Sequence, residues 1–334
     1  MHKKTLSGGQ LNILLKILLA LLLAGALYFD LRAKDNMPTL WQAFMERLTG
    51  ANWFLLIAAI ALMPLNWLAE MKKWHQFVQR YQPFSQWLAY RAVLAGISFS
   101  LFTPNRVGEY GGRILFVRPT HQWKAIIANL VGNFAQLMVL LAAGAGGAVW
   151  FALRFGLVDP YLVYTYSVFA LGSLGLMFFG YFNIDLVIPL AKRIPWLNHV
   201  KRFVKDIRVL RRFSVRELAD ILRWAIIRYA IYCTQYFLLL QYFGIETGIL
   251  PGFLSIFTIF LLQTSIPLPP VVELLMRGNV AVHVWSLFGA NEVSILAATF
   301  GLWIINLILP ALAGAFFIFN VNITKSLGYE DDAV

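Results

Sequence analysis

The sequence predicts an all-α, polytopic membrane bundle with about six full transmembrane helices and two re-entrant helical hairpins in an inverted-repeat arrangement. Of the 334 residues, 60% are hydrophobic and only 13% are charged, whereas charged residues make up about a quarter of soluble domains. The apolar residues gather into windows of about twenty, the length that a helix needs to cross a hydrocarbon core about 30 Å thick. We therefore expect a single integral membrane domain over residues 1–334.

Six windows predict full crossings by their length and apolar composition. They are 11–29, 51–69, 125–151, 161–182, 224–243 and 293–319. The first window, after a charged start, also resembles a cleavable signal peptide. Because Lys16 interrupts it, we favour an uncut first helix.

Two further apolar regions are too short and too interrupted to be plain crossings. The arm 87–102 is followed by prolines, glycines and charges over 103–113, and the arm 249–267 by a proline-rich break and a returning arm, 271–288. Broken backbone at membrane depth is tolerated only inside protein or beside a water-filled cavity. We interpret both regions as re-entrant hairpins; eight kinked crossings remain the alternative.

The distribution of charge orients the bundle in the membrane. With both termini on the cytoplasmic side, the cytoplasmic loops are 71–86, with Lys72, Lys73 and Arg80, and 183–222, with nine Lys and Arg residues against four acids, which satisfies the positive-inside rule. We expect the protein in the plasma (cytoplasmic or inner) membrane. It also makes two inverted halves, 51–151 and 224–319, joined through 161–182 and the basic loop. Paired interrupted segments in inverted halves indicate a transporter's binding site.

The net charge of +12 indicates a membrane surface rather than nucleic acid. Bulky apolar residues alternate with the basic residues over 192–216. Such a segment fits a helix lying on an anionic lipid surface, and a solvated loop that only sets topology is an equal alternative.

The first hairpin contains the candidate binding residues Arg106, Glu109 and Arg113. Their spacings of three and four place them on one helix face, and charges at membrane depth are usually functional. Glu109 can pair with either arginine, leaving the other for an anion such as phosphate. The alternative is that all three anchor the chain at the headgroup level.

Further candidate substrate-binding residues lie elsewhere in the two halves. Glu273 and Arg277 repeat the spacing of four in the second hairpin and either neutralise each other or act as a gate or proton-coupling pair. Asn133 and Gln136 form a polar stripe that also fits simple helix pairing. Arg228 lies about one turn inside its crossing and either points into a cavity or reaches a headgroup.

The sequence contains no phosphate-binding loop, zinc-ligand spacing or nucleophile elbow. Cys233 is the only cysteine, which excludes an internal disulfide. We therefore expect no enzyme activity, no metal and no cofactor.

The segment Thr103-Pro104-Asn105-Arg106-Val107-Gly108-Glu109 resembles the Thr-Pro-Gly-Arg-x-Gly-Glu signature of the lysylphosphatidylglycerol synthase membrane-domain family. The resemblance covers most of the chain and includes Glu70 and Trp74. It maps Arg106 and Glu109 onto the family's paired residues and Glu273 onto a later glutamate. The family's soluble aminoacyl-transfer domain has no counterpart in this sequence. Gly132-Asn133 and Pro269-Pro270 depart from the family pattern.

The resemblance implies a flippase-like protein that moves an anionic or modified lipid, such as a phospholipid, glycolipid or polyprenyl lipid, between leaflets. One alternative is an intramembrane lipid-modifying enzyme with Glu109 or Glu273 as its base. Another is a membrane scaffold that recruits a separate lipid synthase through the basic loop. The oligomeric state, including a homo-oligomer, stays open.

Overall fold

The computed structural model describes residues 37–50, 52–101, 103, 107–183, 213–264 and 270–318. Every regular element within these ranges is a helix. Four helical stretches are long and apolar enough to cross a membrane: Trp53–Val78, Pro119–Phe155, Pro160–Phe182 and Glu292–Ile318. The predicted helix 11–29 and residues 192–212 of the basic stretch lie outside the described residues.

The long helices correspond to predicted crossings but extend beyond them. They are α3 (Trp53–Val78), α6 (Gln122–Phe155), α7 (Pro160–Phe182) and α10 (Val215–Tyr242). Helix α3 continues nine residues past the expected end at residue 69, into a stretch that its charges indicated as a cytoplasmic loop. Helix α10 has a Ser214–Glu217 capping box and a charged first half. It is not among the four apolar stretches.

Both interrupted regions form short helices with a break between them. The first contains α4 (Gln86–Ser100) and α5 (Gly108–Ile114), and the second α11 (Ile249–Thr264) and α12 (Pro270–Ser286). At 1.5 Å per residue, even the longest of these helices extends only about 26 Å, less than the hydrocarbon core of about 30 Å.

The last apolar stretch consists of α13 (Glu292–Trp303), a π-helical turn η6 (Ile304–Ile308) and α14 (Leu309–Ile318). Pro310 explains the π turn, because it has no N–H to donate to the carbonyl of Asn306, four residues earlier. The N–H of Leu309 instead donates to the carbonyl of Ile304, a π-type hydrogen bond. Such turns often occur at functional sites.

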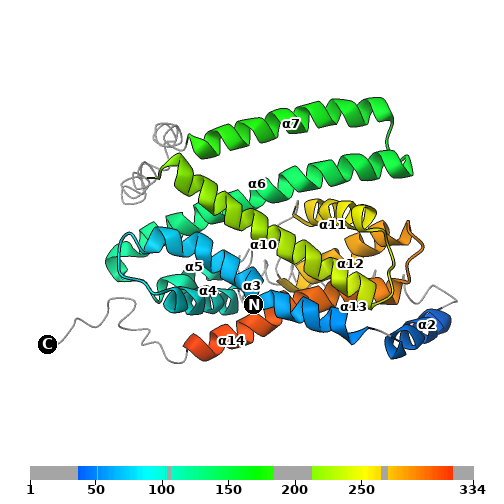
Figure 1. Ribbon diagram of the computed structural model, residues 1–334, viewed down its shortest axis with the longest axis horizontal. Coiled ribbons are helices and arrows are strands. Elements are labelled where there is room, and N and C mark those ends of the chain that lie inside the picture. The colour runs from blue at the N-terminus through cyan, green and yellow to red at the C-terminus, as the bar shows by residue number, and fades with distance from the viewer. Residues whose placement is uncertain are drawn as a thin grey trace, which may run out of the picture.

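The two halves pack reciprocally around a central pair of helices. Helices α3 and α10 form the centre, α4 of the first half packs on α14 of the second, and α11 of the second half packs on α6 of the first. Figure 1 shows α10 running diagonally across the bundle. The hydroxyl of Ser98 donates to the carbonyl of Ala311 at 2.6 Å. A Cβ atom at Gly147 of α6 would lie 2.6 Å from the carbonyl oxygen of Leu254 in α11.

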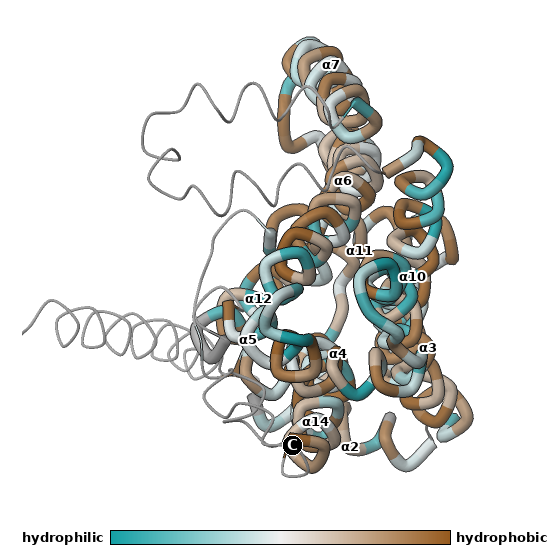
Figure 2. Tube along the Cα trace, turned by 90° about the vertical axis from the view of Figure 1, so that its left-hand side faces the viewer, coloured by the Kyte–Doolittle hydropathy of each residue, from teal (hydrophilic) through white to brown (hydrophobic). Residues whose placement is uncertain are grey.

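Apolar packing divides into two clusters that follow this arrangement. One lies around Trp74 and joins α3, α4, α6 and the first part of α10, and the other lies around Trp285 and joins α10 to α11, α12 and α13. Helix α7 contacts mainly α6 and lies at the periphery (Figure 2). Most of its large apolar side chains are exposed. A short helix, α2 (Met37–Thr49), packs on α13. The peripheral apolar surface suits lipid as its solvent.

The close contact of α4 with α5 predicts different effects for two adjacent glycines. An added Cβ at Gly112 would lie 2.6 Å from the Ala95 carbonyl oxygen and the Gly96 Cα, whereas one at Gly111 would meet nothing within 4 Å. We expect Gly112→Ala to lower the free energy of unfolding by about 1–3 kcal/mol. Gly111→Ala should leave it unchanged or raise it by up to about 1 kcal/mol. Denaturant unfolding in micelles measures both, and equal effects would contradict this packing.

Candidate functional site

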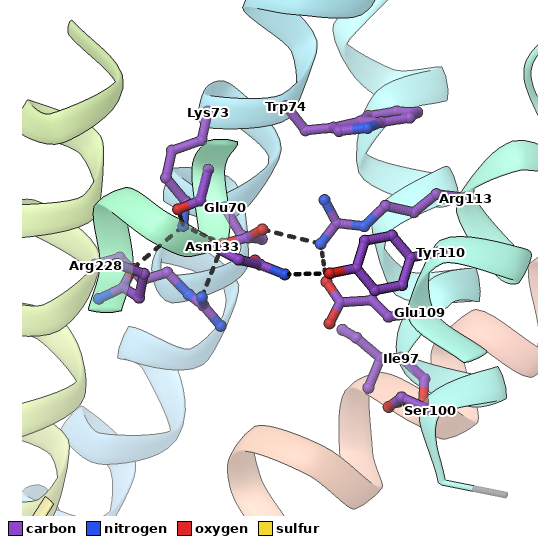
Figure 3. Close-up of polar contacts among 12 residues, drawn as sticks. Glu70, Lys73, Trp74, Ile97, Ser100, Glu109, Tyr110, Arg113, Asn133 and Arg228 are labelled. Carbon is purple, nitrogen blue, oxygen red and sulfur yellow. Dashed lines mark hydrogen bonds and ion pairs between the residues drawn. The ribbon is translucent and has the colours of Figure 1, made fainter. Parts of the chain in front are cut away.

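A buried carboxylate on α3 is the centre of the largest charge cluster that the described residues form. Glu70, with 2% of its side chain exposed, contacts the Lys73 ammonium at 2.6 Å, the Arg113 guanidinium at 2.9 Å and the Arg228 guanidinium at 2.8 Å. These cations come from α3, α5 and α10 (Figure 3). One carboxylate therefore connects the first hairpin to both central helices.

Arg113 completes the cluster through a second carboxylate. It pairs with Glu109 four residues earlier on α5, and only 1% of its side chain is exposed. Its guanidinium also lies over the ring of Trp74, 5.7 Å from the centroid, and the Trp74 N–H donates to the Ala125 carbonyl at 3.2 Å. We call Glu70, Lys73, Glu109, Arg113 and Arg228 the Glu70 cluster.

Helix α6 supplies the polar groups beside this cluster. The Lys73 ammonium donates to the side-chain oxygen of Gln136 at 3.2 Å, and the Gln136 amide nitrogen donates to the Ala225 carbonyl at 3.4 Å. The Asn133 amide donates to the Tyr110 hydroxyl at 3.2 Å, linking α6 to α5 (Figure 3). Both amides thus join helices, and only Gln136 also borders the cavity described next.

A cavity of about 190 Å³ lies between the two halves. Its lining comes from α3, α6, α10, α11, α12, α13 and the π turn. Two lining residues are charged, Arg228 and Arg277, and both are arginines. The amide and hydroxyl-bearing lining residues are Asn66, Gln136, Gln263, Thr264, Asn306, Tyr229 and Tyr232. The apolar and indole-bearing ones are Trp67, Leu140, Phe260, Trp303 and Leu307. We call this space the central cavity.

Arg228 connects the Glu70 cluster to the central cavity. Its guanidinium lies over the indole of Trp67, 4.9 Å from the ring centroid, while Nη1 donates to Glu70. Trp67, Glu70 and Trp74 occur at helical spacings of three and four on α3, so each tryptophan supports one of the two arginines that bind Glu70. The resulting contacts hold Arg228 at the wall of the cavity.

Arg277 reaches the cavity from the second hairpin. Its Nε and Nη2 donate to Glu273 at 3.0 and 2.5 Å, and Nη1 donates to the side-chain oxygen of Gln263 at 3.3 Å. The Gln263 amide donates in return to the Arg277 carbonyl at 3.4 Å. The Glu273–Arg277 pair predicted from the sequence is therefore formed, and α11 fixes its position.

The two hairpins share one local pattern. Each first arm ends at a threonine whose hydroxyl donates to the carbonyl four residues earlier, Thr103 to Phe99 at 3.3 Å and Thr264 to Phe260 at 2.8 Å. Each second arm then carries a glutamate paired with an arginine four residues later. The Thr103 hydroxyl oxygen also accepts from the N–H of Gly108, the first residue of α5, at 2.6 Å.

The candidate residues predicted from the sequence fall into three groups. Gln136, Arg228 and Arg277 line the central cavity. Glu109, Arg113, Asn133 and Glu273 support the surrounding helices through the contacts above. Arg106 lies outside the described residues, so its role stays a prediction, as do the binding roles of the others.

Sequence reasoning missed several polar residues at the site. Glu70 and Lys73 follow the apolar window 51–69, and the charges near them indicated a loop, although Glu70 entered through the family resemblance. Asn66 donates to the side-chain oxygen of Asn306 at 2.8 Å, across 240 residues of sequence. The available signal was the row of polar and indole side chains on one face of α3. Among the described residues, no group of three or more His, Cys, Asp or Glu side chains has the arrangement of a metal site.

A comparison with known families places this site in context. The family model described as the lysylphosphatidylglycerol synthase TM region matches residues 13–314. The chain belongs to this family. The match confirms the predicted resemblance and supports a multi-pass membrane protein related to lipid handling. Neither a curated protein nor a solved structure matches the chain.

The charge balance at Glu70 predicts a large effect of a nearly isosteric change. We expect Glu70→Gln to lower the free energy of unfolding by about 3–5 kcal/mol, because Lys73, Arg113 and Arg228 lose a buried carboxylate. Lys73→Met should cost less, since two arginines still neutralise Glu70. Denaturant unfolding in micelles tests the order of the two effects.

Asp220→Asn provides the control for this experiment. Asp220 pairs with Arg223 at 3.1 Å, and both side chains are at least half exposed. Solvent screens such a pair, so its loss should cost less than about 1 kcal/mol. An effect of Glu70→Gln no larger than that of Asp220→Asn would contradict the central role of Glu70.

Proposed function

We propose that this protein moves an amphipathic membrane lipid between leaflets, with the polar headgroup in the central cavity and the acyl chains in the bilayer. The observation that carries this proposal is a polar cavity between the two halves, lined by two arginines of the second half and by polar side chains of the first. Charged groups at membrane depth are costly, and they commonly mark a substrate pathway. The family's relation to lipid handling supports the same function.

The short hairpin helices provide the means for access from either side. We propose that both hairpins are re-entrant and that they open the cavity alternately toward the cytoplasm and the outside. Interrupted membrane helices require polar surroundings at their breaks, and Thr264, the last residue of α11, lines the central cavity. Reciprocal packing of α4 on α14 and α11 on α6 fits the inverted repeats of transporters. In this proposal both termini lie in the cytoplasm and the protein occupies the cytoplasmic membrane.

The first prediction of this function concerns the amides in the cavity. Replacing both Asn66 and Asn306 with leucine removes a hydrogen-bonded pair of lining residues together, which is nearly neutral for folding compared with breaking the pair. Each hydrogen bond that a headgroup loses is worth about 1–3 kcal/mol, so leaflet exchange should slow about five- to hundredfold. The assay is exchange of labelled phospholipids in proteoliposomes.

A matched control removes another buried hydrogen-bonded pair that does not line the cavity. Tyr236 and Thr299 join α10 to α13 at 2.8 Å, and Tyr236→Phe with Thr299→Val should leave exchange unchanged. Equal exchange by the Asn66/Asn306 variant and the natural protein would overturn the role of the cavity. Exchange no faster than in protein-free vesicles, across anionic, zwitterionic and glycosylated lipids, would overturn the proposed function.

The proposal assigns transport rather than chemistry to the site. We therefore expect lipids recovered from the exchange assay to have unchanged masses. A new lipid species that requires Glu109 or Glu273 would instead identify an intramembrane enzyme. Mass spectrometry of the extracted lipids distinguishes the two outcomes.

A further inference from the structure

We infer that the central cavity selects a singly charged phosphodiester headgroup that carries hydroxyl groups and no cationic substituent. This inference rests on the proposed function and names its substrate class. It follows from the sign of the lining charges, the balance of charge behind them, and the side chains that fill the remaining wall.

The sign of the lining charges selects an anion. Among the described residues, those that line the cavity include two guanidinium groups, those of Arg228 and Arg277, and no carboxylate. Glu70 and Glu273 lie behind these arginines and are not among the lining residues. The planar guanidinium fork matches the oxygens of a phosphate, and the tetrahedral phosphate group can accept hydrogen bonds from two directions. An anion in the cavity therefore meets Arg228 of α10 and Arg277 of α12.

The charge balance favours one negative charge over two. In the Glu70 cluster, the three cations Lys73, Arg113 and Arg228 face two carboxylates, while Arg277 is balanced by Glu273. Counted over the described residues named here, the two groups together carry one net positive charge. A phosphodiester carries a single negative charge, whereas a phosphomonoester carries about −1.5 to −2 at neutral pH. The phosphodiester therefore completes the balance of these groups.

Arg228 can turn toward a ligand without leaving an unpaired carboxylate behind. If a phosphate oxygen replaced Glu70 as its partner, Glu70 would keep the Lys73 ammonium at 2.6 Å and the Arg113 guanidinium at 2.9 Å. Breaking a buried ion pair is costly mainly because it leaves one charge uncompensated. The third cation around Glu70 removes most of that cost.

The rest of the cavity suits hydroxyl groups. Its volume of about 190 Å³ equals that of about six water molecules at about 30 Å³ each, more than a phosphate group alone fills. The amides of Asn66, Gln136, Gln263 and Asn306 line this space with both donors and acceptors. Trp67 and Trp303 supply flat apolar surfaces. A glycerol or sugar unit matches such a wall.

The same lining disfavours a cationic headgroup. The lysylated headgroup for which the family is named carries ammonium groups, which in this cavity would approach two guanidinium groups and no carboxylate. Like charges in a low-dielectric site repel strongly. The inference therefore separates this chain's preferred ligand from the lysylated lipid.

Two soluble probes that share a phosphodiester test the selection. Glycerophosphoglycerol carries a hydroxylated glycerol on both sides of the phosphate, and glycerophosphoethanolamine carries an ammonium group in place of one of these glycerols. We expect the full-length protein in micelles to bind the first at least tenfold more tightly by calorimetry. Glycerol 3-phosphate and glycerol should both bind more weakly than glycerophosphoglycerol. Equal or tighter binding of glycerophosphoethanolamine would overturn the inference.

Variants of the two lining arginines test where glycerophosphoglycerol binds. Arg228→Gln and Arg277→Gln should each weaken glycerophosphoglycerol binding at least tenfold. Arg223→Gln, on the same helix as Arg228 but with its side chain 61% exposed, should have no effect. If Arg277→Gln fails to fold, Glu273→Gln with Arg277→Gln removes both partners and keeps the test. Unchanged binding by the folded cavity variants would overturn the assignment.

A second measurement separates a lipid headgroup from a free phosphodiester. In nanodiscs with equal phosphatidylglycerol and phosphatidylethanolamine, native mass spectrometry should detect at least tenfold more retained phosphatidylglycerol. Retention of this lipid identifies a lipid source, whereas binding of the soluble probe without lipid selectivity identifies a free one. Selectivity for neither would overturn the inference.

The outcomes also separate this inference from the proposed function. Selective binding without leaflet exchange would support the headgroup assignment and reject transport. Leaflet exchange without preference for the hydroxylated phosphodiester would support transport and reject the headgroup assignment.

Discussion

The arrangement of the site depends on neutralising Glu70 away from water. An isolated carboxylate in a low-dielectric interior is prohibitively costly, and Glu70 meets this constraint with cations from α3, α5 and α10. The same contacts determine where the first hairpin lies, because α5 cannot move away without separating the buried Arg113 guanidinium from Glu70. Contacts between charged groups therefore position the first hairpin, whose helices are too short to span the hydrocarbon core.

The second hairpin meets a similar constraint. Its Glu273–Arg277 pair is formed within α12, and Arg277 also contacts Gln263 of α11 and Tyr232 of α10. Around the first hairpin, the Glu70 cluster combines three cations and two carboxylates, and two indole rings lie beside it. The two hairpins thus share a pattern in which a glutamate pairs with an arginine four residues later and other helices contact that arginine.

The fold followed from the sequence where the signal was local. Apolar windows predicted the long helices now seen as α3, α6, α7 and the α13–α14 stretch, and prolines and glycines predicted the interruptions in both hairpins. The spacing of four predicted contact between Glu273 and Arg277, because such residues share a helix face; Glu109 was predicted to pair with Arg106 or Arg113, and it pairs with Arg113. These features depend on neighbours within one or two helical turns.

The parts that could not be predicted depend on contacts between distant residues. The Arg228–Glu70 pair spans 158 residues and the Asn66–Asn306 pair spans 240, so neither has a local signature. The charges after residue 69 were misleading because they favoured a loop. Glu70 and Lys73 instead form a buried ion pair, and α3 continues through them. The central cavity required both halves to be placed before any of its lining residues could be grouped.

Reciprocal packing has a consequence for how the chain is made. Helix α4 of the first hairpin packs on α14, the last helix that the structure describes. During synthesis, therefore, α4 lacks this packing partner until α14 has entered the membrane. A product truncated before α14 would leave the face of α4 around Ser98 uncovered.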